Sequence, residues 1–388
     1  MKLFFGLISF LFLSQAYADL ERWQKWEVER NDLQLNSSIY HQLPSKAELS
    51  SYQTETLYVL EIDPGKVDFI SAKSLKPEIF EKLKTADGKI KFYIHPKATE
   101  LFKELISQGT LKEVSARPTT SPRTFFVDDL MVKVSLPQKI NGAIRTVYPL
   151  QMSRATAIND LLSQASGFHF LPEPLAFYDK TPNSPFGFIV REIPATLVKG
   201  SNTLVPLLSY VAKHSDGSLL EKEAALRGVS AEHLVLQEIL PSLLEAFIKG
   251  AQHGVALEMH QQNTLLEIDQ SGKFTGRIFY RDLDGARVDF ELRKKLGFKD
   301  ETLLSQKDAA WIFDLENLQK MRSKKVPGSR PQEWSPVMET AFQTYLVGSS
   351  FDILKKKLKS LNFHPSFEQV IKREFKKTNT LSCQRIFL

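Results

Sequence analysis

The sequence predicts an α+β protein, and three observations support that fold class. Short runs rich in β-branched and aromatic residues lie between about residues 57 and 193 and are typical of strands. Apolar residues recur at helical spacing through most of the chain after about residue 200. One strand–turn–strand pattern interrupts that helical part, around Gln270-Ser271-Gly272. We therefore expect a sheet-bearing middle and a helical C-terminal region that carries one β-hairpin.

The first residues of the chain predict an export signal. Lys2 supplies a positive charge, an apolar run extends from Leu3 to Leu13, and Ala16-Tyr17-Ala18 fits the small-x-small rule for cleavage before Asp19. The run is shorter than the ~20 residues of a transmembrane helix, and the sequence holds no other such stretch. We expect a periplasmic or secreted chain that loses residues 1–18 and has no transmembrane segment. An uncleaved anchor is the alternative.

Local patterns predict the elements of the first half. A strand runs from Leu57 to Ile62, where Asp63-Pro64-Gly65 ends it, and a turn at Asp128-Asp129 separates two short strands. The expected elements are, in order, strand 57–62, a helix from Ala98 that Gly109 stops, strands 124–127 and 130–136, helix 152–166, and strands 174–178 and 187–193.

The second half is more helical. Apolar residues from Leu236 to Ala251 predict a long buried helix that ends near Gly254. Strands 264–268 and 277–280 form the predicted hairpin, and the patterns after Ala309 are helical to the end of the chain.

Composition and charge exclude several classes of protein. Hydrophobic residues make up 42% and charged residues 25%, which excludes disordered, collagen-like and coiled-coil chains. The single cysteine, Cys383, excludes an intrachain disulfide framework and a cysteine-rich metal site. The net charge is +6, and Lys355-Lys356-Lys357 with Lys359 is the dense basic cluster. Leucines at helical spacing there predict the solvated face of an amphipathic helix, so we expect no nucleic-acid partner.

The densest polar cluster of the sequence runs from Glu258 to Asn263, between the buried helix and the hairpin. A hairpin of this length returns Asp282 close to Asn263. A carboxamide and a carboxylate that converge are suited to Mg²⁺, which prefers oxygen ligands and also keeps phosphate oxygens and waters. The alternative is a polar turn capped by side-chain hydrogen bonds.

The same spacing is similar to that of kinase-like phosphotransferases. Those enzymes place an Asn five residues after a catalytic carboxylate, and a metal-binding Asp after a hairpin. Here Glu258 precedes Asn263 by five residues, Asp282 follows the hairpin, and Lys133 lies on an upstream strand where it could meet phosphates. The glycine-rich loop of kinases is missing from the sequence.

An upstream cluster combines cations and hydroxyls around two strands. Ser121, Arg123 and Thr124 are followed by Lys133 and Arg145 within 25 residues of one another. Arg clamps phosphates or carboxylates with two parallel hydrogen bonds, and Lys acts as a point charge, so the group is suited to a polyphosphate and a carboxylate. The alternative for each residue alone is a solvated strand face.

Taken together, these residues resemble the NRPS-independent siderophore synthetases, the aerobactin-synthetase (IucA/IucC) family. The motifs that carry the resemblance occur in one order along the chain. They are His95-Pro96 with Gly109-Thr110-Leu111, Ser121-Pro122-Arg123-Thr124, Val132 to Leu136, Arg145, Val190-Arg191-Glu192, Leu204 to Leu207, Glu258-x-His260-x-Gln262-Asn263, and Arg281-Asp282.

The resemblance implies a cupped-hand fold with fingers of antiparallel sheet, a mostly helical palm and a thumb that is reduced in this chain. It divides the sequence into a signal peptide (1–18), a thumb-like segment (19–92), a fingers-like nucleotide-binding region (93–200) and a palm-like region (201–388). It implies an enzyme of siderophore biosynthesis and iron acquisition, a ligase that uses ATP and Mg²⁺ to adenylate citrate or a related carboxylate. An amine or hydroxylamine then attacks. A homodimer is one expected assembly.

The resemblance also assigns roles to single residues. The implied catalytic residues are Lys133, Arg145, Glu258 and His260, with Arg145 facing the substrate carboxylate. The implied metal ligands are Asn263 and Asp282. The residues implied to surround ATP are Ser121, Arg123, Thr124, Lys133, His260, Gln262, Asn263 and Asp282.

The chain also departs from the family pattern. The family's His-Pro-x-His-Lys motif has no counterpart, since neither His95-Pro96 nor His364-Pro365 is followed by His-Lys, and Asn141-Gly142 stand where the family has Thr-Ser. Two other hypotheses therefore stay open. The chain could be a kinase-like phosphotransferase with Glu258 as base, or an exported, non-catalytic relative that binds an anionic ligand.

Overall fold

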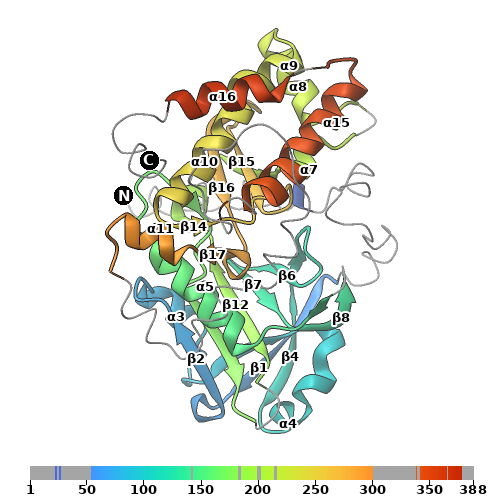
Figure 1. Cartoon of the computed structure of the whole chain (residues 1–388). Helices are drawn as coiled ribbons and strands as arrows, with labels where there is room; N and C mark the ends of the chain where they lie inside the picture. Colours follow the sequence, from blue (N-terminus) through green and yellow to red (C-terminus); the bar gives the residue numbers. More distant parts are fainter. Residues whose placement is uncertain are drawn as a thin grey trace, which may run out of the picture. The chain divides into compact units, whose positions relative to one another are not determined.

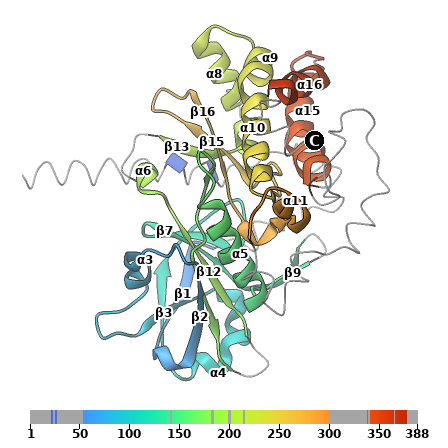
Figure 2. The same ribbon diagram turned by 60° about the vertical axis from the view of Figure 1, so that its left-hand side comes forward.

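The computed structural model confirms an α+β fold (Figures 1 and 2). It describes residues 22–23, 26–27, 54–140, 143–181, 185–198, 202–213, 216–299, 338, 341–364 and 366–377. The predicted signal (1–18) and most of the helical stretch expected after Ala309 lie outside these ranges. Contacts divide the described residues into unit 1, up to Asp160 and from Leu171 to Thr203, and unit 2, which comprises Leu161–Phe170 and the chain from Leu204 onward.

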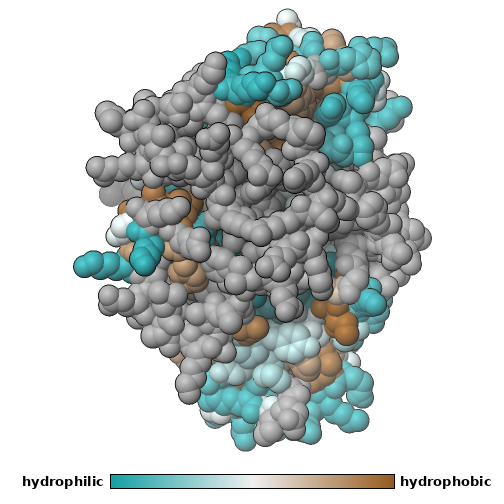
Figure 3. Space-filling model, in the orientation of Figure 1, coloured by the Kyte–Doolittle hydropathy of each residue, from teal (hydrophilic) through white to brown (hydrophobic). Residues whose placement is uncertain are grey.

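Figure 3 shows hydrophilic residues predominating at both ends of the view, with apolar residues in smaller patches. No helix within the described ranges combines the length and the apolar character needed to cross a bilayer.

Unit 1 contains two main antiparallel sheets. The larger has the order β2-β11-β12-β7-β6-β5, and the smaller has the order β3-β1-β4. The strands of the larger sheet are β2 (Val67–Ser71), β5 (Arg117–Pro118), β6 (Thr124–Val127), β7 (Leu130–Val134), β11 (Leu175–Asp179) and β12 (Gly187–Glu192). Those of the smaller are β1 (Thr56–Ile62), β3 (Ile90–Ile94) and β4 (Thr110–Ser115).

A short hairpin and several helices complete unit 1. The hairpin pairs β8 (Leu136–Ile140) with β9 (Ala143–Arg145). The helices are η2 (Pro64–Lys66), α3 (Pro77–Lys82), η3 (Pro96–Phe102), α4 (Lys103–Ile106), α5 (Pro149–Leu162) and α6 (Ala195–Val198).

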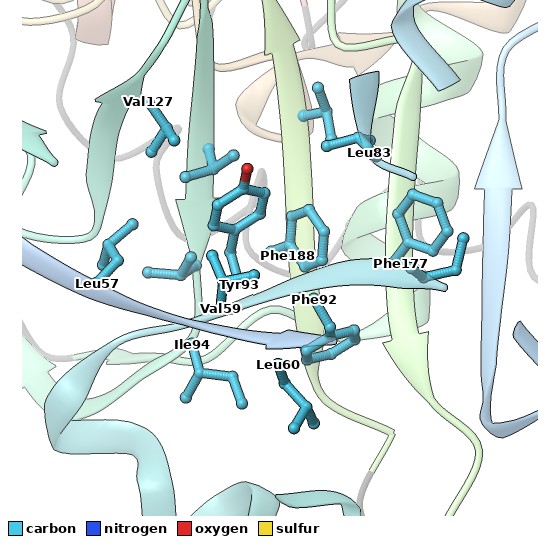
Figure 4. Close-up of a cluster of buried hydrophobic side chains, with 14 of the residues drawn as sticks. Leu57, Val59, Leu60, Leu83, Phe92, Tyr93, Ile94, Val127, Phe177 and Phe188 are labelled. Carbon is cyan, nitrogen blue, oxygen red and sulfur yellow. The ribbon is translucent and has the colours of Figure 1, made fainter. Parts of the chain in front are cut away.

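The core of unit 1 lies between its two sheets. Side chains of β1 and β3 meet those of β7, β11 and β12 (Figure 4), and Phe188 packs edge-on against Phe92, with 5.2 Å between ring centroids. Val132 and Val134 of β7 belong to this core, as the alternation predicts. Since successive strand residues face opposite sides, Lys133 lies on the other face of the sheet. Buried apolar area of this kind stabilises a fold by about 25 cal/mol per Å².

Unit 2 combines a small sheet with long helices. Its four strands have the order β10-β16-β15-β13, and a second ladder pairs β14 with β17. The strands are β10 (His169–Phe170), β13 (Thr203–Pro206), β14 (Val255–Ala256), β15 (Thr264–Ile268), β16 (Phe274–Tyr280) and β17 (Arg287–Val288).

Helices form most of the rest of unit 2. They are α7 (Leu207–Tyr210), α8 (Leu219–Arg227), α9 (Ala231–Leu234), η4 (Val235–Ile239), α10 (Leu240–Gln252), η5 (Leu283–Gly285), α11 (Phe290–Lys295), η7 (Ala341–Phe351), α15 (Asp352–Ser360) and α16 (Phe367–Lys377). The helices α9, η4 and α10 follow one another without a break, which confirms the predicted buried helix. Gly254 follows it at φ +63°, the left-handed conformation typical of a helix end.

Several sequence predictions need correction in their limits, among them the strand expected over 277–280, which begins at Phe274. The helix expected from Ala98 is the 3₁₀ helix η3 followed by one turn of α-helix, and the helix expected over 152–166 is α5. The strand expected over 130–136 is interrupted at Ser135. The Ser135 hydroxyl donates to the Gly187 carbonyl and accepts from the Val147 amide, each at 2.9 Å, and the chain enters the β8–β9 hairpin there.

The basic cluster of α15 is not uniformly solvated, which corrects a further prediction. Lys355 and Lys359 are exposed, but Lys357 is 2% exposed and places its Nζ 2.6 Å from the Glu221 carboxylate. Lys357 shares the buried side of the helix with Ile353 because the two lie four residues apart. Burial opposes ionisation of Glu221, but hydrogen bonds from Lys357 and Ser218 lower its pKa to about 2.

Candidate functional site

The predicted residues of unit 1 start with a buried hydroxyl and a buried ammonium side by side. Thr124 of β6 pairs directly with Lys133 of β7, which pairs in turn with Ile189 of β12. Thr124 and Lys133 are each 2% exposed. Both lie on the sheet face opposite the hydrophobic core between the two sheets.

The turn before β6 carries the other two residues of the Ser-x-Arg-Thr motif. The Thr124 amide donates to the Ser121 carbonyl at 3.3 Å, and the Arg123 carbonyl accepts from the Val134 amide at 2.8 Å. The Arg123 guanidinium is 7% exposed and donates to the carbonyl of Arg145 at 3.0 Å. All five predicted residues of this unit therefore come from one turn, two paired strands and the end of the neighbouring hairpin.

In unit 2, the segment from Glu258 to Asn263 is folded by its own backbone. The His260 amide donates to the Glu258 carbonyl at 2.8 Å, and the Asn263 amide donates to the His260 carbonyl at 2.9 Å. The helix η7 holds this segment from outside: the Ser350 hydroxyl donates to the Met259 carbonyl at 2.7 Å. The polar cluster is therefore a fixed turn and not an open loop.

The β15–β16 hairpin brings the second motif back to this turn, as the sequence predicts. Thr264 pairs with Tyr280, so the residues after Tyr280 lie beside Asn263. The Arg281 amide donates to the Asn263 carbonyl at 3.1 Å. Its guanidinium donates to the Gln262 carbonyl through Nη2 at 2.8 Å and Nε at 3.1 Å. Arg281 is thus a structural clamp between the two motifs.

Tyr280 and Gly285 fix the position of Glu258 relative to Asp282. The buried Tyr280 hydroxyl accepts from the Glu258 amide and donates to the Asp282 carbonyl, each at 3.2 Å. A Cβ at Gly285 would stand 2.5 Å from Glu258 Oε2, so a larger residue there would push that carboxyl out of its present position. Asp282 itself has φ +75°, a left-handed conformation that costs energy for most side chains.

Burial raises the pKa of Glu258 above its ordinary value. Arg287 and a hydrogen bond from Tyr345 oppose that rise, whereas Asp282 and Asp284 add to it. His260 Nδ1 accepts from the Gln262 amide at 3.3 Å, so the neutral ring carries its proton on Nε2. The site thus combines a carboxyl that readily holds a proton with a histidine of defined tautomer.

The donor set fits a hard divalent cation that is completed by other ligands. No group of three or more His, Cys, Asp or Glu side chains converges within the described part of the chain. Asn263 Nδ2 donates to the Glu258 carbonyl at 3.3 Å, which assigns Oδ1 as the amide atom that could ligate a metal. With the Asp282 carboxylate, this gives two oxygen ligands, a number compatible with Mg²⁺ when phosphate oxygens and waters supply the rest.

Sequence reasoning missed four residues that shape this site. Tyr280 and Gly285 adjoin the Arg281-Asp282 motif, and an aromatic or glycine beside a functional Asp is a signal that could have been used. Arg287 lies in the next strand, and Tyr345 lies 87 residues beyond Glu258, where no local pattern points to it.

The raised pKa of Glu258 predicts a pH-dependent stability effect. Ionisation of Glu258 is less favourable in the folded protein, so its contribution to stability is fully present below the ordinary carboxyl pKa and is lost as pH rises through the raised value. Glu258→Gln, which cannot ionise, should therefore melt at a higher temperature than wild type at pH 8. At pH 4 the difference should vanish.

The matched control for that prediction is Glu245→Gln on α10, where the carboxylate is exposed. Its melting temperature should follow that of wild type at both pH values. A Glu258→Gln variant that melts below wild type at pH 8 would show that the charged carboxylate stabilises the fold.

Comparisons with known protein families match both halves of the chain. Residues 40–212 match the model of the IucA / IucC family. Residues 235–324 match the model described as "Ferric iron reductase FhuF-like transporter", which covers the hairpin and the motifs at Glu258–Asn263 and Arg281–Asp282.

Curated relatives share parts of the chain. A spermidine-citrate ligase of Bacillus anthracis is 26% identical over 227 residues, which are 50% of this chain and 37% of the relative. The rhizobactin siderophore biosynthesis protein RhbC of Rhizobium meliloti (strain 1021) is 25% identical over 193 residues, 43% of this chain and 32% of that protein. The matched part therefore spans about a third of the length of these relatives.

Solved structures match nearly the whole chain. The ATP-bound aerobactin synthetase IucA from a hypervirulent pathotype of Klebsiella pneumoniae aligns with a TM-score of 0.62 and 16% identity, over 96% of this chain and 73% of that chain. The petrobactin biosynthesis protein AsbB from Bacillus anthracis str. Sterne aligns with a TM-score of 0.59 and 15% identity, over 94% and 68%. Residues 40–212 are therefore similar to the IucA/IucC family, and the chain has the fold of the aerobactin synthetases.

Proposed function

We propose that this chain is an ATP- and Mg²⁺-dependent ligase of siderophore biosynthesis. It would adenylate a carboxylate of citrate or a related acid and condense it with an amine or hydroxylamine. The observation that carries the proposal is the turn at Glu258–Asn263, which Arg281 clamps beside Asp282 in a chain with the aerobactin-synthetase fold. The relatives named above support the same class of chemistry, since one is a spermidine-citrate ligase.

In the first step, a carboxylate oxygen would attack the α-phosphorus of ATP and expel pyrophosphate. Negative charge grows on the phosphate oxygens, and Arg123 and Lys133 are the cations of unit 1 suited to stabilise it, because fixed charges need no reorganisation. Arg145 would pair with the carboxylate substrate, for which a guanidinium offers two parallel hydrogen bonds. Asn263 and Asp282 would hold Mg²⁺, which supplies further charge stabilisation when bound.

In the second step, the amine or hydroxylamine nitrogen would attack the acyl carbon and AMP would leave. The nitrogen must lose a proton, and the site offers two groups that can carry one. Glu258 has a raised pKa, which brings a carboxyl closer to the working range of a general base. The Gln262 amide donates to Nδ1 of His260, so neutral His260 carries its proton on Nε2. From there it is suited to donate a hydrogen bond to a phosphate oxygen.

The reaction products distinguish this proposal from its rivals. The chain is incubated with Mg-ATP, a panel of polycarboxylates and hydroxylamine, and we expect a trapped hydroxamate with release of pyrophosphate and AMP. Release of ADP would identify a kinase-like phosphotransferase instead. A thermal shift with Mg-ATP but no turnover would identify a non-catalytic binding protein, and neither shift nor turnover would contradict the proposal and the kinase hypothesis.

A further inference from the structure

Two residues near the start of the chain lie against the turn that carries Ser121 and Arg123. Trp23 is 2% exposed and Glu27 is completely buried. Glu27 Oε2 accepts a hydrogen bond from the Thr120 amide at 3.1 Å, although the two residues are 93 positions apart. Glu27 Oε1 accepts from Trp23 Nε1 at 2.9 Å. One carboxylate thus ties the N-terminal segment to the turn.

Hydrogen bonds within the turn hold its other residues, whereas Glu27 holds the Thr120 amide from outside the turn. The Thr119 amide donates to the Thr124 carbonyl at 3.0 Å, and the Ser121 amide donates to Thr119 Oγ1 at 3.1 Å. The Thr120 amide instead points to Glu27. Thr120 directly precedes Ser121, so the Glu27 carboxylate sets the backbone orientation of the residue next to the predicted phosphate contact.

Trp23 anchors Glu27 on the same sheet face as the predicted site. Its indole ring meets the Phe126 ring edge-on, with 5.1 Å between centroids. Phe126 lies two residues after Thr124 on β6, so their side chains share a face. The Trp23 ring thus lies against the sheet, and the Glu27 carboxylate, which its Nε1–H holds, lies against the turn.

We propose that Glu27 is a positioning residue for the anion-binding turn of unit 1. It acts through the Thr120 amide and holds Ser121 and Arg123 in the conformation that receives the phosphates of ATP. A turn fixed before binding loses less conformational entropy when the ligand arrives, which raises affinity without a new contact. The inference rests on the proposed function for its ligand, but the connection to Thr120 is independent of it.

The test is Glu27→Gln in the full chain. Glutamine keeps the shape of the side chain but has a single carbonyl oxygen. The Thr120 amide and Trp23 Nε1–H, which each donate to one carboxylate oxygen of Glu27, can then no longer both be satisfied. We expect hydrogen exchange at the Thr120 amide to accelerate about 10-fold or more, as the loss of one hydrogen bond to a charged group implies. We expect KM for ATP to rise by a similar factor, with KM for the carboxylate and kcat within about twofold of wild type.

Glu78→Gln, an exposed carboxylate on α3 in the same unit, is the matched control and should leave all four quantities unchanged. Trp23→Phe keeps a ring against Phe126 but removes the Nε1–H donor. Hydrogen exchange at the Thr120 amide should accelerate in this variant too, but by a smaller factor. This variant serves as the test if Glu27→Gln does not fold.

Wild-type exchange at Thr120 in a folded Glu27→Gln protein, or in folded Trp23→Phe if the first variant is unfolded, would overturn the proposal. So would an unchanged KM for ATP alongside accelerated exchange. If wild type itself neither binds nor turns over ATP, the proposed function fails, and the exchange measurement alone still decides whether Glu27 holds the turn.

Discussion

Replacing Arg191 by methionine is expected to lower the free energy of unfolding by about 3–5 kcal/mol, a large effect for one side chain. Arg191 on β12 and Glu173 form an ion pair in which the side chains are 2% and 0% exposed. Arg191 Nε donates to Glu173 Oε1 at 2.9 Å. Without the guanidinium, the Glu173 carboxylate stays in a site from which water is excluded, and this penalty, more than the lost bond, destabilises the folded state.

Urea denaturation followed by circular dichroism measures this loss. Two further variants test whether the loss of stability comes from leaving a buried charge without its partner. Lys89→Met removes one partner of the exposed pair Lys89–Asp87 and should cost less than about 1 kcal/mol. Arg191→Met combined with Glu173→Leu replaces both buried charges and should recover most of the stability. A loss below about 1 kcal/mol for Arg191→Met alone would show that the buried pair is not an important source of stability.

The features that the sequence predicted correctly are encoded over short distances. The hairpin β15–β16 follows from alternation around a Gln-Ser-Gly turn, and its register then dictates that Arg281 meets Asn263. The faces of β7 follow from period-two alternation, which places Val132 in the core and Lys133 opposite. In both cases, the pattern that reveals the element also fixes which residues come together.

The features that the sequence did not predict depend on distant partners. The sequence predicts an exposed Lys357 because lysine is normally exposed, yet the half-buried carboxylate of Glu221, 136 residues earlier, pairs with its ammonium group. The contact from Glu27 to Thr120 and that from Ser350 to Met259 span 93 and 91 residues. No periodicity of apolar residues reports such pairings, since they arise only when separate elements pack.

Asp282→Gly is expected to separate the function of Asp282 from its part in folding. Glycine accepts the left-handed conformation at φ +75° without the cost that a side chain carries, which offsets the greater flexibility of the unfolded chain. We therefore expect the free energy of unfolding to stay within about 1 kcal/mol of wild type. Turnover should nevertheless fall at least ~100-fold, the scale on which one preorganised charge-stabilising group acts.

Asp128→Gly provides the matched control, because Asp128 also has positive φ, at +52°, but lies exposed in the turn between β6 and β7. The free energy of unfolding of Asp128→Gly should also stay close to that of wild type, and the Mg²⁺ dependence of its kcat/KM should be unchanged. If Asp282→Gly retains wild-type turnover over the same Mg²⁺ titration, the metal assignment is wrong. If Asp282→Gly unfolds while Asp128→Gly does not, the carboxylate serves the fold. Only a folded, inactive Asp282→Gly protein with a folded, active Asp128→Gly protein agrees with a carboxylate held in a strained conformation for its charge.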